Sequence, residues 1–196
     1  MTIDENETTD RRVLRGERNR EAVVNALIEL VNEGDITPTA AQVADRAGVS
    51  LRTIYHHFDD VEGLQMAMAE RIFAGLMELI TPLPSDGPLE FRIGAFVAER
   101  AMLYEQAMPA FRASRANAVT SPSVAKQILR GHKYLRTECE QTFAIELSDA
   151  PGWKVEAVDA ATSIDGWVRL RIHQGLSVEL AREVLANTMR AILVSP

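Results

Sequence analysis

Two adjacent histidines, His56 and His57, are the residues that most suggest chemistry in this chain, within the stretch GVSLRTIYHHF. A helical metal site needs ligands three or four residues apart, because adjacent side chains on a helix point about 100° apart. His132 and Cys139 are seven residues apart, which is about 10 Å along a helix axis and too far for one ion without further ligands. We therefore expect no metal site.

Motifs of catalysis are absent from the sequence. It contains no GxSxG nucleophile turn, no P-loop, no GxGxxG dinucleotide loop and no telling cysteine–histidine spacing. The sequence therefore predicts that the protein is not an enzyme and uses no cofactor.

The composition is that of a globular protein in a reducing compartment. Apolar residues make up 46% and charged residues 25% of the 196 residues, and the single cysteine excludes an internal disulfide. The acidic start, MTIDENETTD, is no signal peptide, and no apolar run approaches the roughly 18 residues of a membrane helix. We expect a cytoplasmic protein that does not associate with membranes.

The net charge of −7 conceals a basic segment near the N-terminus. Residues 1–10 carry four acids and no bases, whereas RRVLRGERNR over residues 11–20 carries five arginines and one glutamate. A local basic segment of this kind can bind nucleic acid even in an acidic protein. We expect residues 1–17 to form a flexible acidic tip and basic arm, with DNA contacts from Arg11, Arg12, Arg15 and Arg18.

The apolar periodicity is helical along almost the whole chain and predicts an all-α fold of about nine helices. Three helices would form an N-terminal domain over residues 18–60, and a larger helical body would span residues 61–196. A fourth helix would end near Leu79, before the breaker cluster TPLPSDGP. Five more helices are expected over residues 88–107, 109–118, 122–147, 153–174 and 177–194, three of them opened by a first-turn proline.

A helix-turn-helix pattern occupies residues 40–58, as AAQVADRA, then GVS, then LRTIYHHF. Thr39 with Gln42 predicts a capping box on the first helix, and Ser50 predicts a cap on the second. Ile54 would anchor the second helix, leaving six side chains exposed: Leu51, Arg52, Thr53, Tyr55, His56 and His57. These types suit a major groove, where arginine reads guanine, leucine meets a thymine methyl, and hydroxyls and imidazoles contact phosphates.

The run AAQVADRAGVSLRTIYHHF resembles the DNA-binding signature of the TetR family of transcriptional repressors, over about residues 18–70. The stretch GWVRLRIHQGLSVELAREVLANTMRAIL is similar to the last two helices of many such regulators. The resemblance implies a homodimer on a palindromic double-stranded DNA operator, and a body pocket whose small-molecule ligand releases the DNA. It implies phosphate contacts by Thr53, Tyr55 and His57, next to the helix cap Ser50, and base contacts by Leu51, Arg52 and His56.

One position departs from the family pattern. The family commonly has a lysine three residues after the final aromatic of the motif, whereas this chain has Val61, preceded by Asp59 and Asp60. One phosphate contact is therefore missing, and the arginines of the arm are candidates to replace it through phosphate neutralisation.

The last two predicted helices carry apolar and small residues at alternating spacings of three and four, which is typical of bundle packing. This stripe can be an internal core or a dimer seam. With the resemblance added, we expect a four-helix dimer interface that contains Ala157, Ala161, Ile164, Val168, Val178, Ala181, Leu185, Thr188 and Ile192.

Aromatic and methionine residues of the body are candidates for a ligand pocket, although such residues at helical spacing are more often plain core. A pocket made from them would take a largely apolar small molecule. The candidates are Phe73, Met77, Phe96, Met102, Tyr104, Phe111, Tyr134, Phe143 and Trp167.

The function predicted from these features is that of a ligand-responsive, TetR-like transcriptional repressor. The alternative is a helical adaptor or ligand-binding protein that uses its helix-turn-helix for protein contacts. The polar face around Arg52, Thr53 and Tyr55 argues against the adaptor, since protein contacts alone would not require it.

Overall fold

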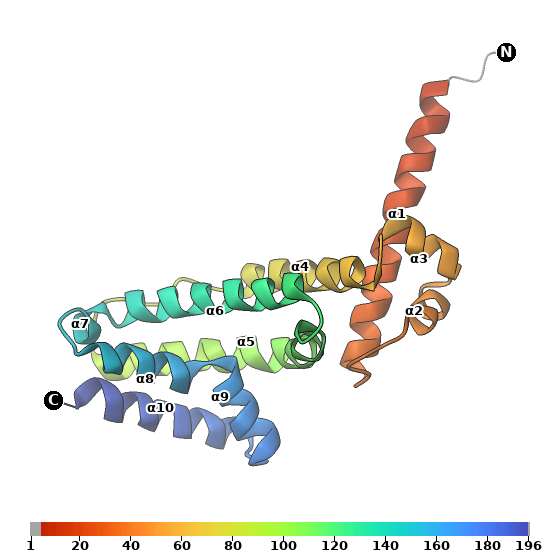
Figure 1. Ribbon diagram of the computed structural model, residues 1–196. Helices are drawn as coiled ribbons and strands as arrows, with labels where there is room; N and C mark the ends of the chain where they lie inside the picture. Colours follow the sequence, from red (N-terminus) through yellow and green to blue (C-terminus); the bar gives the residue numbers. More distant parts are fainter. Residues whose placement is uncertain (1–4, 196) are drawn as a thin grey trace. The chain divides into compact units, whose positions relative to one another are not determined.

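A computed structural model describes residues 5–195, and side chains from residue 13 onward, as an all-helical chain without strands (Figure 1). This confirms the predicted all-α class. The helices are α1 (Glu5–Asn32), α2 (Ala40–Ala47), α3 (Leu51–His57), α4 (Val61–Leu79), α5 (Leu89–Ala118), α6 (Pro122–Thr142), α7 (Ala144–Leu147), α8 (Gly152–Thr162), α9 (Ile164–Val168) and α10 (Val178–Val194), with a π-helical turn at Arg169–His173 between α9 and α10.

The chain divides into two compact units. The first contains the described residues up to Ala74 together with Pro109–Ile128, and the second contains Gly75–Met108 together with the described residues from Leu129 onward. This division differs from the predicted boundary at residue 60, because Leu64 and Met68 of α4 and Ala113 of α5 belong to the apolar cluster of the first unit.

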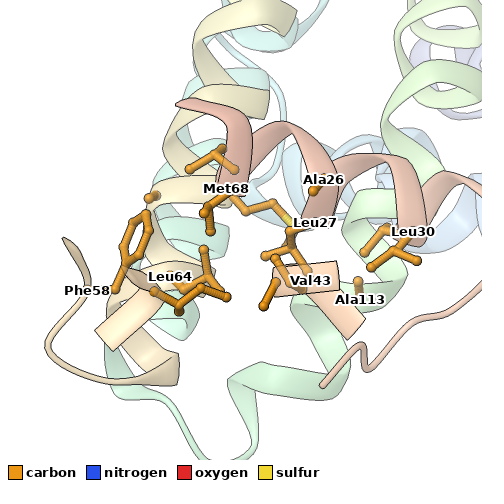
Figure 2. Packing of buried hydrophobic residues seen from close by; sticks show 14 residues of the cluster. Ala26, Leu27, Leu30, Val43, Phe58, Leu64, Met68 and Ala113 are labelled. Carbon is orange, nitrogen blue, oxygen red and sulfur yellow. The ribbon is translucent and has the colours of Figure 1, made fainter. Parts of the chain in front are cut away.

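The first unit is held together by fourteen buried apolar residues from α1 to α5, eight of which are labelled in Figure 2. Val23, Leu27 and Val31 of α1 provide one side of this cluster at helical spacing. Val43 of α2 and Ile54 of α3 are 0% and 2% exposed, so each short helix is anchored through one apolar face. Burial of this face stabilises helices that are too short to persist alone.

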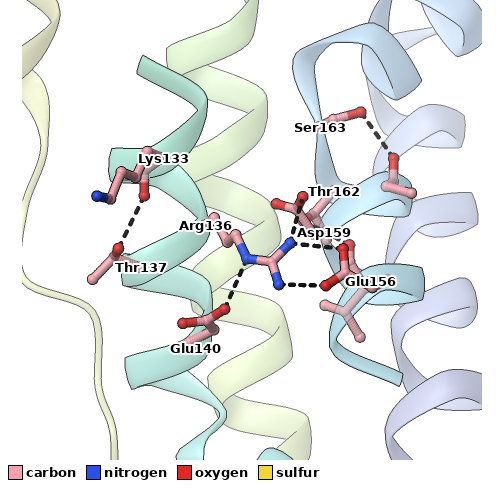
Figure 3. A network of polar contacts seen from close by, with 10 residues as sticks. Lys133, Arg136, Thr137, Glu140, Glu156, Asp159, Thr162 and Ser163 are labelled. Carbon is pink, nitrogen blue, oxygen red and sulfur yellow. Dashed lines mark hydrogen bonds and ion pairs between the residues drawn. The ribbon is translucent and has the colours of Figure 1, made fainter. Parts of the chain in front are cut away.

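The second unit packs α8 against α10 and surrounds buried aromatic side chains. The rings of Phe96 and Phe143 meet edge-on with centroids 5.3 Å apart. Tyr104 donates a hydrogen bond of 2.7 Å to the carbonyl of Thr162. Arg136 joins α6 to α8 through Glu156 and Asp159, at 2.6 and 3.4 Å (Figure 3).

The structure corrects the predicted helix boundaries at Pro109, Phe143 and Ser163. Pro109 lies inside the continuous helix α5 and does not start a new one. A proline costs about 3 kcal/mol in a helix interior, and burial of Ala107 and Ala110 on either side offsets part of that cost. The predicted helix over residues 153–174 is interrupted at Ser163, whose extended backbone ends α8 and whose side chain caps α9 by accepting from the Gly166 amide at 3.1 Å.

Candidate nucleic-acid interface

The turn between α2 and α3 has the hydrogen bonds that its sequence predicts. Thr39 and Gln42 form the capping box at the start of α2. Gly48 ends the helix at φ +65°, a left-handed conformation that favours glycine. The Val49 amide then donates to the Ala44 carbonyl at 3.0 Å, which closes the turn. The chain therefore leaves α2 at a defined angle before α3 begins.

Helix α3 presents a polar face to solvent while one apolar residue holds it in place. Ser50 caps it by accepting from the Thr53 amide at 3.1 Å, and the two hydroxyls lie 2.8 Å apart. Ile54 is buried. The side chains of Leu51, Arg52, Tyr55 and His56 are exposed, and Thr53 is half-buried. This is the arrangement that a groove-reading helix requires.

His57 is directed differently from the rest of the predicted set. A methyl group at Gly16 of α1 would lie 3.6 Å from its Cε1 atom, so the ring lies against α1. Burial lowers the pKa of His57, with smaller contributions from His56 and Arg20. The two histidine rings touch edge-on with centroids 5.3 Å apart. Their closeness does not make a metal site, since within residues 13–195 no group of three possible ligands could hold an ion.

The predicted flexible arm differs from the structure, because α1 already begins at Glu5. The side chains of Arg11 and Arg12 lie outside the described part of the chain. Arg15 and Arg18 are exposed on α1, and the Arg20 guanidinium lies 5.3 Å from the centre of the Phe58 ring. The basic segment therefore lies within a long helix that continues into the core of the first unit.

One of the two acidic residues that precede Val61 has a structural role at the start of α4. Asp60 caps α4 by accepting from the Gly63 amide at 2.8 Å. Val61 is 43% exposed. Val61 and Tyr55 both line a pocket in the first unit. The sequence did not predict this pocket, because its lining residues come from separate segments of the chain.

Comparisons with known proteins cover both units. No family model matches the chain. The HTH-type transcriptional regulator BetI of Klebsiella pneumoniae is 28% identical over 187 residues, covering 90% of this chain and 95% of that protein. A tetR-family transcriptional regulator from Streptomyces coelicolor has a TM-score of 0.70 at 18% identity, over 90% of this chain and 80% of its own. The multidrug binding protein EbrR, solved with imidazole, has a TM-score of 0.62 at 16% identity, over 89% of each chain.

The chain has a TetR-like fold. The resemblance seen in the motif is thereby confirmed for the fold of both units. Within residues 5–195 no helix is long and apolar enough to span a membrane.

The predicted ligand pocket stays a prediction, and its nine residues differ in unit and in burial. Phe73 and Phe111 belong to the first unit, and the other seven belong to the second. Phe96, Tyr104, Phe143 and Trp167 are at most 1% exposed and pack as core. Met102 and Tyr134 are 40% and 41% exposed, and Met77 is half-buried. A cavity of about 40 Å³ has Tyr104 among its lining, beside the polar side chains of Arg100, His132 and Asp159.

The predicted dimer seam stays a prediction, and its nine residues differ in how deeply the single chain buries them. Ile164, Ala181 and Leu185 are 6%, 0% and 3% exposed in the single chain, so they belong to its own core and are not free for a partner. Six other members of the predicted set are only half-buried: Ala157, Ala161, Val168, Val178, Thr188 and Ile192. The apolar residues of α10 that are exposed, Leu180, Ala191 and Val194, lie on one helical face with the half-buried Val184, and this face is shifted by about one residue from the predicted stripe.

Proposed function

We propose that this protein is a cytoplasmic transcriptional regulator that binds a palindromic DNA operator as a homodimer and represses transcription until a small molecule releases it. The observation that carries the proposal is the exposed polar face of α3, held by Ile54 and capped by Ser50. The BetI relative and the TetR-like fold support it.

The proposed contacts divide α3 by what each side chain can bind. Arg52 would donate to a guanine, Leu51 would pack on a thymine methyl, and His56 would read a base edge. Thr53 and Tyr55 would donate to phosphates, which position the helix without reading sequence. His57, which lies against α1, would steady α3 in place of a direct phosphate contact.

The basic turns of α1 would supply phosphate neutralisation in place of the missing lysine at position 61. Arg15 and Arg18 are exposed on α1, and Arg11 and Arg12 continue the basic segment. Each phosphate that is neutralised steepens the salt dependence of binding by about one unit of the logarithmic slope. Removal of residues 1–16 should therefore flatten that slope.

The proposed homodimer uses the largely exposed apolar face of α10, a helix that packs against α8 within the second unit. Leu180 and Val194 are 45% and 65% exposed, and with Val184 and Ala191 they lie on one helical face. Leu180→Glu should shift the protein from dimer to monomer in sedimentation velocity. Arg182→Ser, at an exposed position off this face, should leave the dimer intact.

The proposed effector binds the second unit. The similarity of EbrR, a multidrug binding protein solved with imidazole, supports a small-molecule site in a body of this fold. A ligand can lower DNA affinity only as far as it prefers the conformation that does not bind DNA. We expect a largely apolar molecule, as the aromatic character of the body implies.

Selection of bound sequences from a random DNA library tests the proposal. A regulator should enrich a palindrome whose half-sites are about one helical turn apart, roughly 34–36 Å. Fluorescence anisotropy on the enriched duplex should give binding that weakens steeply with salt. Enrichment of no sequence, with equal affinity for all duplexes, would contradict sequence-specific regulation.

A further inference from the structure

A pocket of about 380 Å³ lies within the first unit, apart from the body in which an effector site is expected. Its floor is apolar and deeply buried, because Val31, Leu64 and Met68 are 1%, 3% and 1% exposed. Figure 2 shows Leu64 and Met68 among the sticks of the cluster that forms this floor. Tyr55 of α3 and Val61 of α4, both exposed, form part of the wall nearest to solvent.

The size of the pocket and its lining define the class of ligand. Pockets for small molecules span about 300–1,000 Å³, and an apolar cavity of about 150 Å³ already holds benzene. The pocket therefore has room for two fused rings. Gln65 and Asn117 add two amides to the lining, and Tyr55 adds a hydroxyl. Among the described residues that line the pocket none is charged, which favours a neutral ligand with one polar group.

Val61 contributes to the pocket because it is apolar at a position where the family pattern has a lysine. A lysine at this position, which the family pattern leads one to expect, would place a charge beside the apolar lining. Valine instead extends the apolar wall from the buried floor toward solvent. Valine in place of lysine at position 61 therefore has two consequences. It removes the expected phosphate contact, and it leaves an apolar wall beside Tyr55, a residue proposed to bind DNA.

We propose that this pocket is a second small-molecule site, which binds a neutral two-ring aromatic alcohol or a compound of similar size and polarity. A bound ring would contact Tyr55 and Val61 and would hold the tyrosine away from the position that contacts a phosphate. Binding would lower DNA affinity directly in the first unit. This last step rests on the proposed DNA-binding function, whereas binding to the pocket does not.

Methyl NMR of the full chain with labelled methionines tests the site, with 2-naphthol as the probe. Met68 lines the pocket, whereas Met102 and Met189 lie in the second unit and serve as internal controls. The Met68 resonance should shift and saturate as the probe is added, because an aromatic ring beside the methyl changes its shielding. A Met68 resonance that stays unmoved up to the solubility limit of the probe overturns the proposal, as does an equal shift at Met102 and Met189.

Two variants distinguish the effect of changing the pocket wall from the effect of adding a positive unit of charge nearby. Val61→Lys should weaken probe binding roughly tenfold, which corresponds to about 1.4 kcal/mol, since it removes apolar wall and adds a charge. Asp59→Asn adds the same unit of charge at an exposed position outside the lining, and should leave probe affinity unchanged. Equal probe affinities for Val61→Lys and the unmodified protein would contradict the site.

The coupling to DNA is measured with the enriched duplex. Saturating 2-naphthol should lower DNA affinity of the unmodified protein several-fold and should have a weaker effect on Val61→Lys. Unchanged DNA affinity in the presence of saturating probe would overturn the regulatory step. A protein that binds the probe at Met68 but no DNA would contradict the proposed function and leave the pocket standing, so the two failures are distinguishable.

Discussion

Fourteen apolar side chains form the buried cluster of the first unit, whereas the buried residues of the second unit include four that are charged: Arg92, Glu99, Arg100 and Lys154. Among the residues of the first unit whose side chains are described, none that is charged is buried. The second unit encloses charges that must find partners, because an unpaired buried charge is very costly.

The buried arginines of the second unit are well supplied with acceptors. The Arg100 guanidinium donates to Glu99 and Glu138, each at 2.7 Å, and to the Leu135 carbonyl at 3.1 Å. It also lies 4.4 Å from the centre of the Phe96 ring. These partners come from α5 and α6. The directional hydrogen bonds of the buried charges therefore fix how the two helices pair more specifically than apolar contacts alone would.

The comparison teaches that the two units should respond differently to mutation. The first unit can tolerate changes on its exposed polar face with little loss of stability. The second should be sensitive to the loss of a single buried partner. The chain allows a selective readout, because its two tryptophans, Trp153 and Trp167, both belong to the second unit.

Arg100→Ala should have the largest effect on stability. It leaves Glu99 and Glu138 without their shared cation, and removal of one partner from a buried pair costs about 3–5 kcal/mol. Urea denaturation followed by tryptophan fluorescence, at one fixed protein concentration, measures the free energy of unfolding of the second unit.

Arg136→Ala is the matched control for that variant. Arg136 also pairs with several acids, Glu140, Glu156 and Asp159, but they lie nearer to solvent. Exposed pairs are screened by water and contribute little. Losses of similar size for the two variants would show that burial does not distinguish the second unit.

Gly166→Ala should have the next largest effect. A methyl group there would lie 3.0 Å from the Ala161 carbonyl oxygen and 3.3 Å from that of Ala160, so the backbone at the Ser163 break must shift. We expect a loss of roughly 1–3 kcal/mol, as for overpacking. Gly131→Ala, inside α6 with nothing within 4 Å of the added methyl, should instead gain about 0.5–1 kcal/mol. Stability measured by urea unfolding should move in opposite directions for the two glycines.

Glu99→Gln should have the smallest effect and the most informative pH dependence. Burial raises the pKa of Glu99, against the opposing influence of Arg100, and its Oε1 atom has no hydrogen-bond partner in the structure. A pKa that is raised in the folded state adds to the free energy of unfolding at pH values below the ordinary carboxyl pKa of about 4.5. This contribution is lost as the pH rises through the pKa of the folded state.

The glutamine variant should therefore gain stability relative to the unmodified protein at pH 7, and the gain should vanish near pH 4. Tryptophan-detected unfolding at both pH values measures the difference. A variant that loses more stability at pH 7 than at pH 4 would show that the charged form of Glu99 is the stabilising one.

The first unit was the more predictable of the two from sequence, because its features are local. The capping box of Thr39 and Gln42, the left-handed Gly48 and the Ser50 cap each depend on residues within a few positions of one another. The anchoring role of Ile54 follows from the same short pattern. Four features were missed there: the helical state of residues 5–17, the extent of the unit beyond residue 60, the continuity of α5 through Pro109 and the pocket beside Tyr55.

The second unit depends on pairings that periodicity does not reveal. The partners of Arg100 lie 38 and 35 residues away, at Glu138 and Leu135. In α10 the predicted stripe alternates spacings of three and four, whereas the observed buried stripe of Ala181, Leu185, Met189 and Leu193 has a spacing of four. Ala181 and Leu185 belong to both stripes. Spacing alone could not assign Ala181 to the core of one chain rather than to a dimer seam.

The most direct test of DNA recognition by α3 compares Arg52→Ala with Tyr55→Phe on the enriched duplex and on random DNA of equal length. Both side chains are exposed, so neither change should disturb the fold. Arg52→Ala should weaken specific binding by about 1–3 kcal/mol and leave random binding much less affected, as expected for a guanine contact. Tyr55→Phe should weaken both, since phosphates carry no sequence. Equal losses on both duplexes for Arg52→Ala would contradict base reading by α3.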